Sequence, residues 1–136
     1  MYVGEDMGSA VPIIGIVDDD ESVRESISSL VRSAGYRSAV FASAQEFLAA
    51  DPRVEVAVCL VLDVRMPGLS GLELQRCLAD EERSIPIIFV TAHADEQLRA
   101  RALKQGAIAF LGKPFNGDVL LDAIRSALKS SQTSTV

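Results

Sequence analysis

Five short apolar runs recur along the chain, and a segment with helical periodicity follows each of them. The runs are PIIGIV (12–17), YRSAVF (36–41), VAVCLVL (56–62), IPIIFV (85–90) and AIAFL (107–111). Strands that alternate with helices form βα units, which join into a parallel sheet with helices on both faces. The second run is more polar than the others and fits a sheet edge. With right-handed crossovers, the pattern predicts a doubly wound α/β domain with strand order 2-1-3-4-5.

Capping and stop signals predict where several helices begin and end. Gly35 and Gly106 follow helical patterns and predict the ends of the first and fourth helices. Ser43 with Glu46 three residues later predicts a capping box at the start of the second helix. Asn116 is placed to cap the fifth helix.

The length and charge of the chain limit what kind of protein it is. Its 136 residues suit one domain, which we expect over 12–129, with 1–11 as a flexible N-terminal segment and 130–136 as a polar tail or linker stub. The net charge is −6 and no stripe of Lys and Arg is present, which disfavours direct binding of nucleic acid. No apolar run approaches the roughly 20 residues of a membrane span, and the acidic N-terminus does not resemble a signal peptide. Because Cys59 and Cys77 lack metal or redox spacing, we expect a cytoplasmic protein.

Polar residues directly follow four of the five apolar runs. Asp18, Asp19 and Asp20 follow the first run, Asp63 the third, Thr91 the fourth, and Lys113 comes just after the fifth. The carboxyl ends of parallel strands lie at one edge of a sheet, where open α/β sheets build their sites. Each feature has a plainer explanation alone, such as a helix cap or a turn lysine. The joint arrangement on four strand ends favours a functional site.

The chemistry of these side chains is coherent. Clustered carboxylates raise one another's pKa unless a divalent cation lies among them, and their oxygen ligands suit Mg²⁺, with Mn²⁺ as an alternative. An ionised aspartate can attack phosphorus to form an aspartyl phosphate. A lysine can neutralise the charge of the transferred group, and a threonine hydroxyl can hydrogen-bond its oxygens. The pattern therefore predicts metal-dependent phosphoryl transfer to an aspartate.

Four segments resemble the signatures of a known family. IVDDDESVR, LVLDVRMPGLSGLEL, IIFVTAHAD and AFLGKPF resemble the receiver domain of two-component response regulators, and SAQEFL is similar to its FixJ-type branch. The resemblance implies a CheY-like, flavodoxin-like (βα)5 fold. It also implies a signalling switch in which a histidine kinase phosphorylates an aspartate and the altered surface controls an effector. Such a protein is not an enzyme that turns over a separate substrate.

The resemblance also implies which residues form the phosphorylation site. Asp63 matches the phosphoacceptor, and Lys113 matches the lysine that contacts the phosphoryl group. Asp18 and Asp19 match the acidic pair that binds Mg²⁺ together with Asp63, with Asp19 as the expected direct ligand. Arg65 is expected to offer its backbone carbonyl to the metal.

Further positions match the family's switch and its control of dephosphorylation. Thr91 matches the switch hydroxyl, and Phe110 matches the switch aromatic, which is expected to turn inward on phosphorylation. Arg65 and His93 occupy places that influence the dephosphorylation rate in this family. The bond before Pro114 is cis in the family, which would turn the preceding lysine into the site.

The resemblance implies protein partners rather than nucleic acid or membrane. A sensor histidine kinase would supply the phosphoryl group, and the effector would be another protein or a DNA-binding domain in a longer chain. Phosphorylation would promote a homodimer through the fourth helix, fifth strand and fifth helix. On that face Arg99, Arg101 and Lys104 offer positive charges.

Three alternatives remain open at this point. A haloacid dehalogenase-type phosphatase needs a second carboxylate two residues after its nucleophile, but Arg65 occupies that position and cannot act as an acid at neutral pH. An FMN-binding flavodoxin needs a Ser, Thr and Gly phosphate loop, whereas DDDES would repel phosphate. A receiver fold that serves interaction alone, without phosphorylation, is disfavoured by the intact site.

Overall fold

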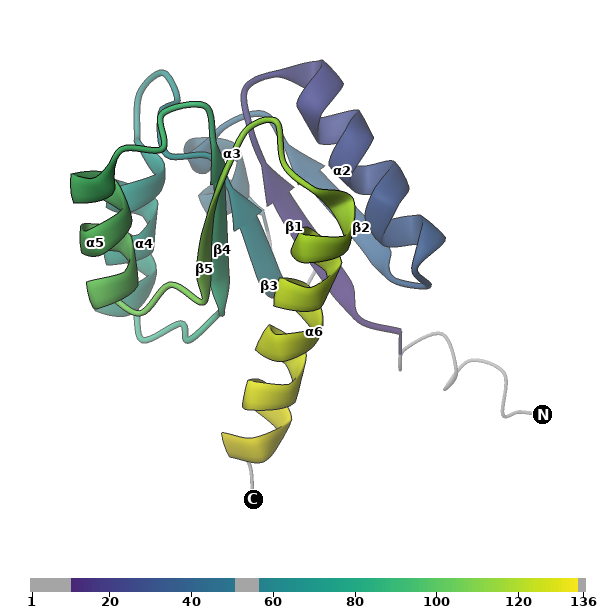
Figure 1. Cartoon of the computed structure of the whole chain (residues 1–136). Helices are drawn as coiled ribbons and strands as arrows, with labels where there is room; N and C mark the ends of the chain where they lie inside the picture. Colours follow the sequence, from purple (N-terminus) through teal and green to yellow (C-terminus); the bar gives the residue numbers. More distant parts are fainter. Residues whose placement is uncertain (1–10, 51–56, 135–136) are drawn as a thin grey trace.

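The computed structural model describes residues 11–50 and 57–134, and within them it contains one five-stranded parallel sheet. The strand order is β2-β1-β3-β4-β5, which confirms the predicted order and places the polar second run at an edge (Figure 1). The strands are β1 (Ile13–Val17), β2 (Arg37–Phe41), β3 (Ala57–Leu62), β4 (Ile87–Thr91) and β5 (Ala109–Gly112).

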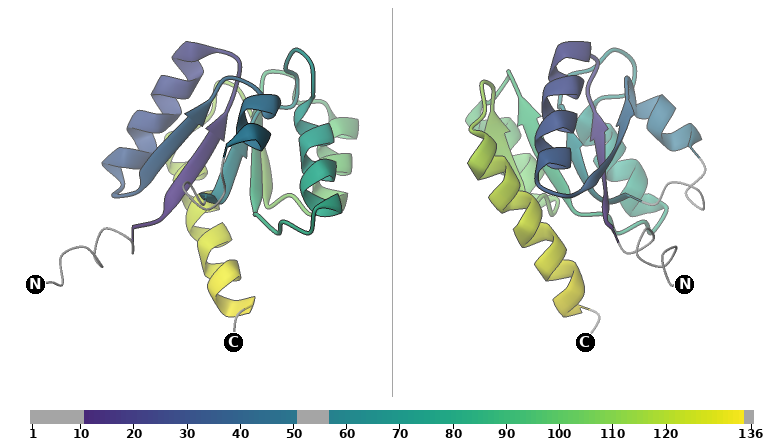
Figure 2. Two further views of the ribbon diagram at one scale, coloured as in Figure 1. Left: turned by 180° about the vertical axis from the view of Figure 1, so that it is seen from behind. Right: turned by 90° about the vertical axis from the view of Figure 1, so that its right-hand side faces the viewer.

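Five helices cover the two faces of the sheet. They are α2 (Glu21–Ser33), α3 (Ala44–Ala49), α4 (Gly71–Asp80), α5 (Glu96–Lys104) and α6 (Gly117–Ser134). Helices α2 and α6 lie on one face of the sheet, and α3, α4 and α5 lie on the other (Figure 2). Apolar side chains of α2 and α6 form one core with the strands, and those of α3, α4 and α5 form a second core. Because neighbouring residues of a strand point to opposite faces, β1, β3 and β4 contribute to both cores and are apolar almost throughout.

The helix ends follow local signals, with one correction. Ser43 caps α3 by accepting the Glu46 N–H at 3.0 Å, but the Glu46 carboxylate accepts the Ala42 N–H rather than that of Ser43, so the predicted capping box is incomplete. A complete capping box instead joins Ser70 and Glu73 at the start of α4. The Glu46 side chain therefore accepts the backbone N–H one residue before the Ser43 N–H that a capping box uses.

The other residues predicted to cap or end helices do so, but α6 is longer than expected at the C-terminus. Gly35 and Gly106 adopt φ angles of +96° and +103°, and Asn116 accepts backbone N–H groups at the start of α6. The helix α6 continues to Ser134, where we expected a polar tail, because no Gly or Pro after Gly117 interrupts it. The expected N-terminal segment falls outside the described residues, apart from residue 11. Among the described helices, none combines the length and apolar character that a membrane crossing requires.

Candidate functional site

The sheet brings the predicted polar residues to one edge. Asp18 directly follows β1, Asp63 directly follows β3, Thr91 is the last residue of β4, and Lys113 directly follows β5. This edge lies at the top of Figure 1, where the loops leave the carboxyl ends of the strands. Parallel strands with in-register ends are sufficient to gather side chains that are far apart in the sequence.

Lys113 forms an ion pair with two buried carboxylates. Its Nζ lies 2.9 Å from Asp18 Oδ2 and 3.3 Å from Asp63 Oδ2, while Asp18 and Asp63 are only 2% and 7% exposed. The bond between Lys113 and Pro114 is cis, as the family resemblance implies. Burying two carboxylates is costly unless a cation compensates them, and Lys113 supplies one positive charge.

The pKa shifts at this edge have identifiable causes. Burial raises the pKa of Asp18 above its usual value, even though that carboxylate accepts hydrogen bonds from the Asp20 N–H and from Lys113. Burial alone would lower the pKa of Lys113, but its hydrogen bond to Asp18 and the charge of Asp63 outweigh burial and raise it. Lys113 is therefore a cation at neutral pH. A single cation does not balance the acidic groups around it.

Three carboxylates are arranged so that they could hold a metal ion. One oxygen from each of Asp18, Asp19 and Asp63 lies within 4.8 Å of the other two. Asp63 Oδ1 is buried and has no hydrogen-bond partner in the described part of the chain, so one acceptor is unused. Oxygen donors of this kind fit Mg²⁺, and the exposed Asp19 leaves the cluster open to solvent on one side. Arg65, whose backbone carbonyl was predicted as a ligand, lies in the following loop and is exposed.

Asp20 does not belong to this cluster. Its Oδ1 accepts the Ser22 and Val23 N–H groups at 2.9 and 3.3 Å and so caps α2. The third acid of the run therefore serves the start of α2 rather than the carboxylate cluster.

The predicted switch residues lie on the neighbouring strands β4 and β5. Thr91 is fully buried, and its Oγ1 accepts the His93 N–H at 3.1 Å. The exposed His93 lies in the loop before α5, since Asp95 rather than His93 caps that helix. Phe110 is 8% exposed, with its ring centroid 6.0 Å from that of Phe89. The aromatic ring therefore lies inward in this structure.

Gly71 and Arg24 contact the backbone of this site, and the sequence predicted neither contact. A Cβ at Gly71 would overlap the Asp63 carbonyl oxygen, so the start of α4 can approach Asp63 this closely only without a side chain. The Gly71 N–H also donates to the Val64 carbonyl at 2.8 Å. Arg24 Nη1 donates to the Asp18 carbonyl at 2.8 Å. In the sequence, the Gly-rich loop PGLSG is compatible with tight packing at Gly71. Arg24 ends the segment IVDDDESVR, but that resemblance gave it no role in the site.

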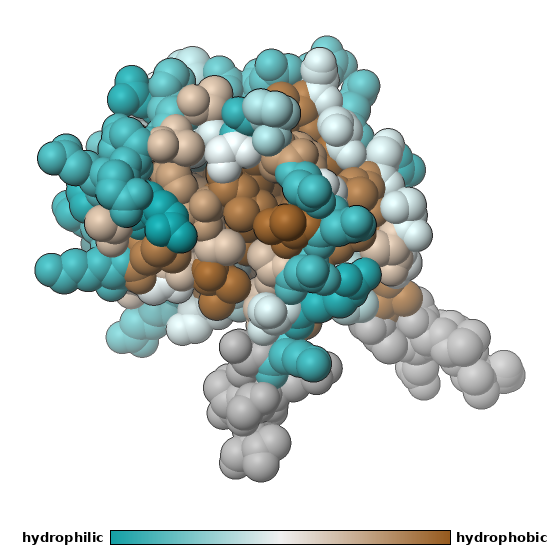
Figure 3. Space-filling view, in the orientation of Figure 1, coloured by the Kyte–Doolittle hydropathy of each residue, from teal (hydrophilic) through white to brown (hydrophobic). Residues whose placement is uncertain are grey.

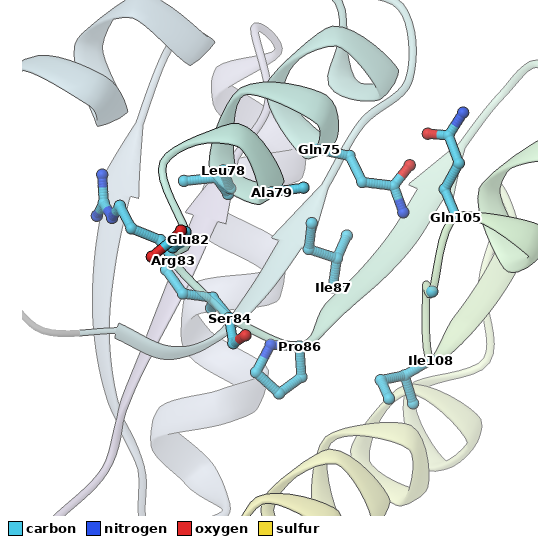
Figure 4. Close-up of a pocket in the computed structure, with 12 residues that line it drawn as sticks. Gln75, Leu78, Ala79, Glu82, Arg83, Ser84, Pro86, Ile87, Gln105 and Ile108 are labelled. Atoms are coloured by element: carbon cyan, nitrogen blue, oxygen red, sulfur yellow. The ribbon is translucent and has the colours of Figure 1, made fainter.

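A separate cavity of about 520 Å³ lies at the opposite edge of the sheet. It is bounded by the end of α4, the start of β4 and the turn before β5 (Figure 4). Gln75 spans one side and donates from Nε2 to the Ala102 carbonyl at 3.2 Å. None of the predicted site residues line this cavity, so it plays no part in the acidic site.

Comparisons with known proteins agree on a family. Residues 14–125 match the family model described as "Response regulator receiver domain". The response regulator protein TmoT of Ectopseudomonas mendocina is 50% identical over 90% of this chain, and the transcriptional regulatory protein FixJ of Bradyrhizobium diazoefficiens is 41% identical over 88% of it. These matches cover 56% of TmoT and 58% of FixJ, so the chain spans little more than half the length of either relative.

A solved structure gives the same result for the fold. The low-resolution structure of response regulator StyR is 47% identical, with a TM-score of 0.83 over 93% of this chain and 63% of the StyR chain. At this level of identity the similarity extends to sequence as well as to shape.

Proposed function

The chain belongs to the family of response regulator receiver domains, and on that premise we propose that Asp63 accepts a phosphoryl group from a sensor histidine kinase. The observation that carries the proposal is the buried Asp63 carboxylate, which bonds Lys113 through Oδ2 while Oδ1 has no partner in the described residues. An unpartnered oxygen on an otherwise fixed carboxylate is suited to form a new bond. The protein then acts as a switch that controls an effector.

The transfer requires positioning and charge neutralisation more than acid–base chemistry. A bond forms between an Asp63 oxygen and phosphorus, and the bond from phosphorus to the kinase histidine breaks, leaving its electron pair on the imidazole nitrogen. Lys113 is held where it can contact the phosphoryl oxygens as their charge develops. Water later hydrolyses the acyl phosphate, and we propose that Arg65 and His93, which are exposed in the loops after β3 and β4, influence that rate.

A bound Mg²⁺ would neutralise the acidic cluster and the incoming phosphoryl group. Asp18, Asp19 and Asp63 would hold it together with the Arg65 backbone carbonyl. Asp18 already uses Oδ1 for the Asp20 N–H and Oδ2 for Lys113, whereas the Asp19 side chain has no protein partner in the described residues. Asp19 is therefore the residue best placed to contact the ion directly.

Substitutions in the acidic triple test the metal assignment. We expect Asp19→Ala to weaken Mg²⁺ binding by about tenfold or more, because it removes a direct ligand. Asp20→Ala serves as the matched control. It removes the carboxylate next to Asp19 in the sequence, which caps α2. It should cost about 1 kcal/mol of stability and leave Mg²⁺ affinity nearly unchanged. Calorimetric titration measures the Mg²⁺ affinity of each variant, and denaturant unfolding measures its stability. Equal losses of affinity would show that the two acids have been misassigned.

Thr91 and Phe110 are proposed to transmit the phosphorylation state. The Thr91 hydroxyl accepts the His93 N–H, so moving towards a phosphoryl group would break that hydrogen bond and alter the loop before α5. The Phe110 ring is buried in this structure, and phosphorylation would favour this inward position. A difference of a few kcal/mol between two states is enough to shift their populations.

The proposed output surface comprises α5, β5 and α6. Arg99, Arg101 and Lys104 are all exposed on α5. Ile108 and Val119 are 37% and 47% exposed, and Figure 3 shows apolar surface in the middle of the corresponding face, with hydrophilic side chains around it. An apolar centre with a charged rim suits protein association. We propose that it binds a second copy or an effector.

Removing either switch side chain should uncouple association from phosphorylation. We expect wild-type protein to associate more strongly when a phosphoryl mimic is bound, and Thr91→Ala and Phe110→Ala to lose most of this increase. Sedimentation velocity with and without the mimic measures the effect. If both variants associate on activation as the wild type does, the coupling assigned to this pair is wrong, even where Asp63 is the acceptor.

The direct test of the proposed function is phosphorylation of the isolated chain by a small acyl phosphate. We expect intact-mass spectrometry to show one added phosphoryl group with Mg²⁺ and none when a chelator removes the metal. Uptake that is independent of the metal would contradict the proposed role of the acidic cluster.

A further inference from the structure

Asp18 is fixed through every polar group that it carries. Its N–H donates to the Phe41 carbonyl at 3.1 Å, and its Oδ1 and Oδ2 accept the Asp20 N–H and Lys113 Nζ, each at 2.9 Å. The remaining group, the backbone carbonyl, accepts Arg24 Nη1 at 2.8 Å. A hydrogen bond from a guanidinium is about twice as strong as one between neutral groups, so this contact is a substantial restraint.

The carbonyl held by Arg24 belongs to the peptide that joins Asp18 to Asp19. Because a peptide unit is planar, fixing the direction of the Asp18 carbonyl also fixes the direction of the Asp19 N–H and the position of its Cα. No hydrogen bond or ion pair in the described part of the chain holds the Asp19 side chain itself. The direction of the Asp19 carboxylate therefore depends on the backbone that precedes it.

We propose that Arg24 is a positioning residue for the metal site, which orients Asp19 through the Asp18 carbonyl. The inference rests on the proposed function in one respect, namely that Asp19 contacts Mg²⁺. Arg24 is suited to this role because its own N–H donates to the Asp20 carbonyl at 3.0 Å, inside the first turn of α2. The arginine thus joins the capped helix to the metal-binding loop by both its backbone and its side chain.

The two ways in which Arg24 could influence the metal site, by its charge and by orienting Asp19, predict opposite changes in Mg²⁺ affinity when Arg24 is removed. A nearby positive charge repels Mg²⁺, so an arginine that acted only by its charge would weaken metal binding, and removing it would strengthen binding. An arginine that positions Asp19 strengthens metal binding, and removing it weakens binding. The sign of the change separates the two roles.

The experiment compares Arg24→Gln and Arg24→Lys with Arg32→Gln. Arg32 is the matched control because it lies on the same helix, and the one side-chain hydrogen bond that it donates among the described residues is a long one, 3.4 Å to the Ser28 carbonyl. We expect Arg24→Gln to weaken Mg²⁺ binding about tenfold by calorimetry, as loss of an outer-shell partner commonly does. Arg24→Lys, which keeps the charge and one donor, should fall between this variant and the wild type, and Arg32→Gln should bind as tightly as the wild type or slightly more tightly. Unchanged or tighter binding by Arg24→Gln would overturn the proposal.

A second measurement needs no metal and separates this inference from the proposed function. In metal-free protein, Arg24→Gln should shift the amide NMR resonances of Asp19 and Asp20, whereas Arg32→Gln should leave them in place. If wild type does not bind Mg²⁺, the proposed metal site fails, while the amide shifts still report whether Arg24 orients the loop. If those resonances do not move, Arg24 does not position Asp19. Circular dichroism checks that each variant is folded, and Arg24→Lys supplies the comparison if Arg24→Gln unfolds.

Discussion

Asp63→Asn should take up no phosphoryl group from a small acyl phosphate under conditions in which the wild type is phosphorylated. The substitution retains the shape of the side chain but replaces a carboxylate oxygen with an amide nitrogen, which cannot form an acyl phosphate. It also removes one of the two carboxylates that bond Lys113. We expect intact-mass spectrometry to detect no phosphorylated Asp63→Asn, against substantial modification of the wild type.

Asp20→Asn is the control for this experiment. It neutralises an acid at the same edge of the sheet, in the loop after β1, but one that caps α2 and lies outside the carboxylate cluster. Asparagine is also a good helix cap. Asp20→Asn should therefore be phosphorylated nearly as well as the wild type. Persistent single-site modification of Asp63→Asn would count against the assignment of Asp63, and loss of modification in both variants would mean that the loss in Asp63→Asn is not specific to Asp63.

Gly71→Ala is expected to lower the stability of the protein and to displace Asp63. The added methyl group would overlap the Asp63 carbonyl oxygen, which is backbone and cannot rotate away as a side chain can. Either α4 or the end of β3 must move, at a cost of about 2 to 3 kcal/mol by analogy with overpacked cores. Denaturant unfolding measures the free energy of unfolding, and the rate of phosphorylation should fall as well, because Asp63 is displaced.

Gly117→Ala provides a matched comparison for this substitution. Gly117 begins α6 as Gly71 begins α4, but a Cβ there would meet only the Leu30 side chain, at 3.3 Å, which can adjust. We expect this variant to change stability by less than about 1 kcal/mol and to be phosphorylated normally. If Gly71→Ala behaves in the same way, the close approach of α4 to Asp63 does not matter for the site.

The sequence predicted the parts of the fold and site that depend on periodicity and strand ends. Apolar runs with helical segments between them specified the strand order, and residues directly after the runs, such as Asp18 and Lys113, necessarily meet at one edge of a parallel sheet. The caps at Asp20 and Asn116 were also predictable, because a cap depends only on neighbouring residues.

Features that depend on three-dimensional contact were not predictable in the same way. The close approach of Gly71 to Asp63 and the bond from Arg24 to the Asp18 carbonyl arise only when helix and loop are packed together. The burial of Phe110 likewise depends on its packing beside Phe89 on the neighbouring strand.

The most direct test of the central claim is to locate the phosphoryl group. Wild-type protein is phosphorylated with Mg²⁺, the acyl phosphate is reduced with borohydride to a stable alcohol, and tandem mass spectrometry identifies the altered residue. We predict a single altered residue, Asp63, dependent on Mg²⁺. Modification at Asp18, Asp19 or any other residue, with Asp63 unaltered, would contradict the account.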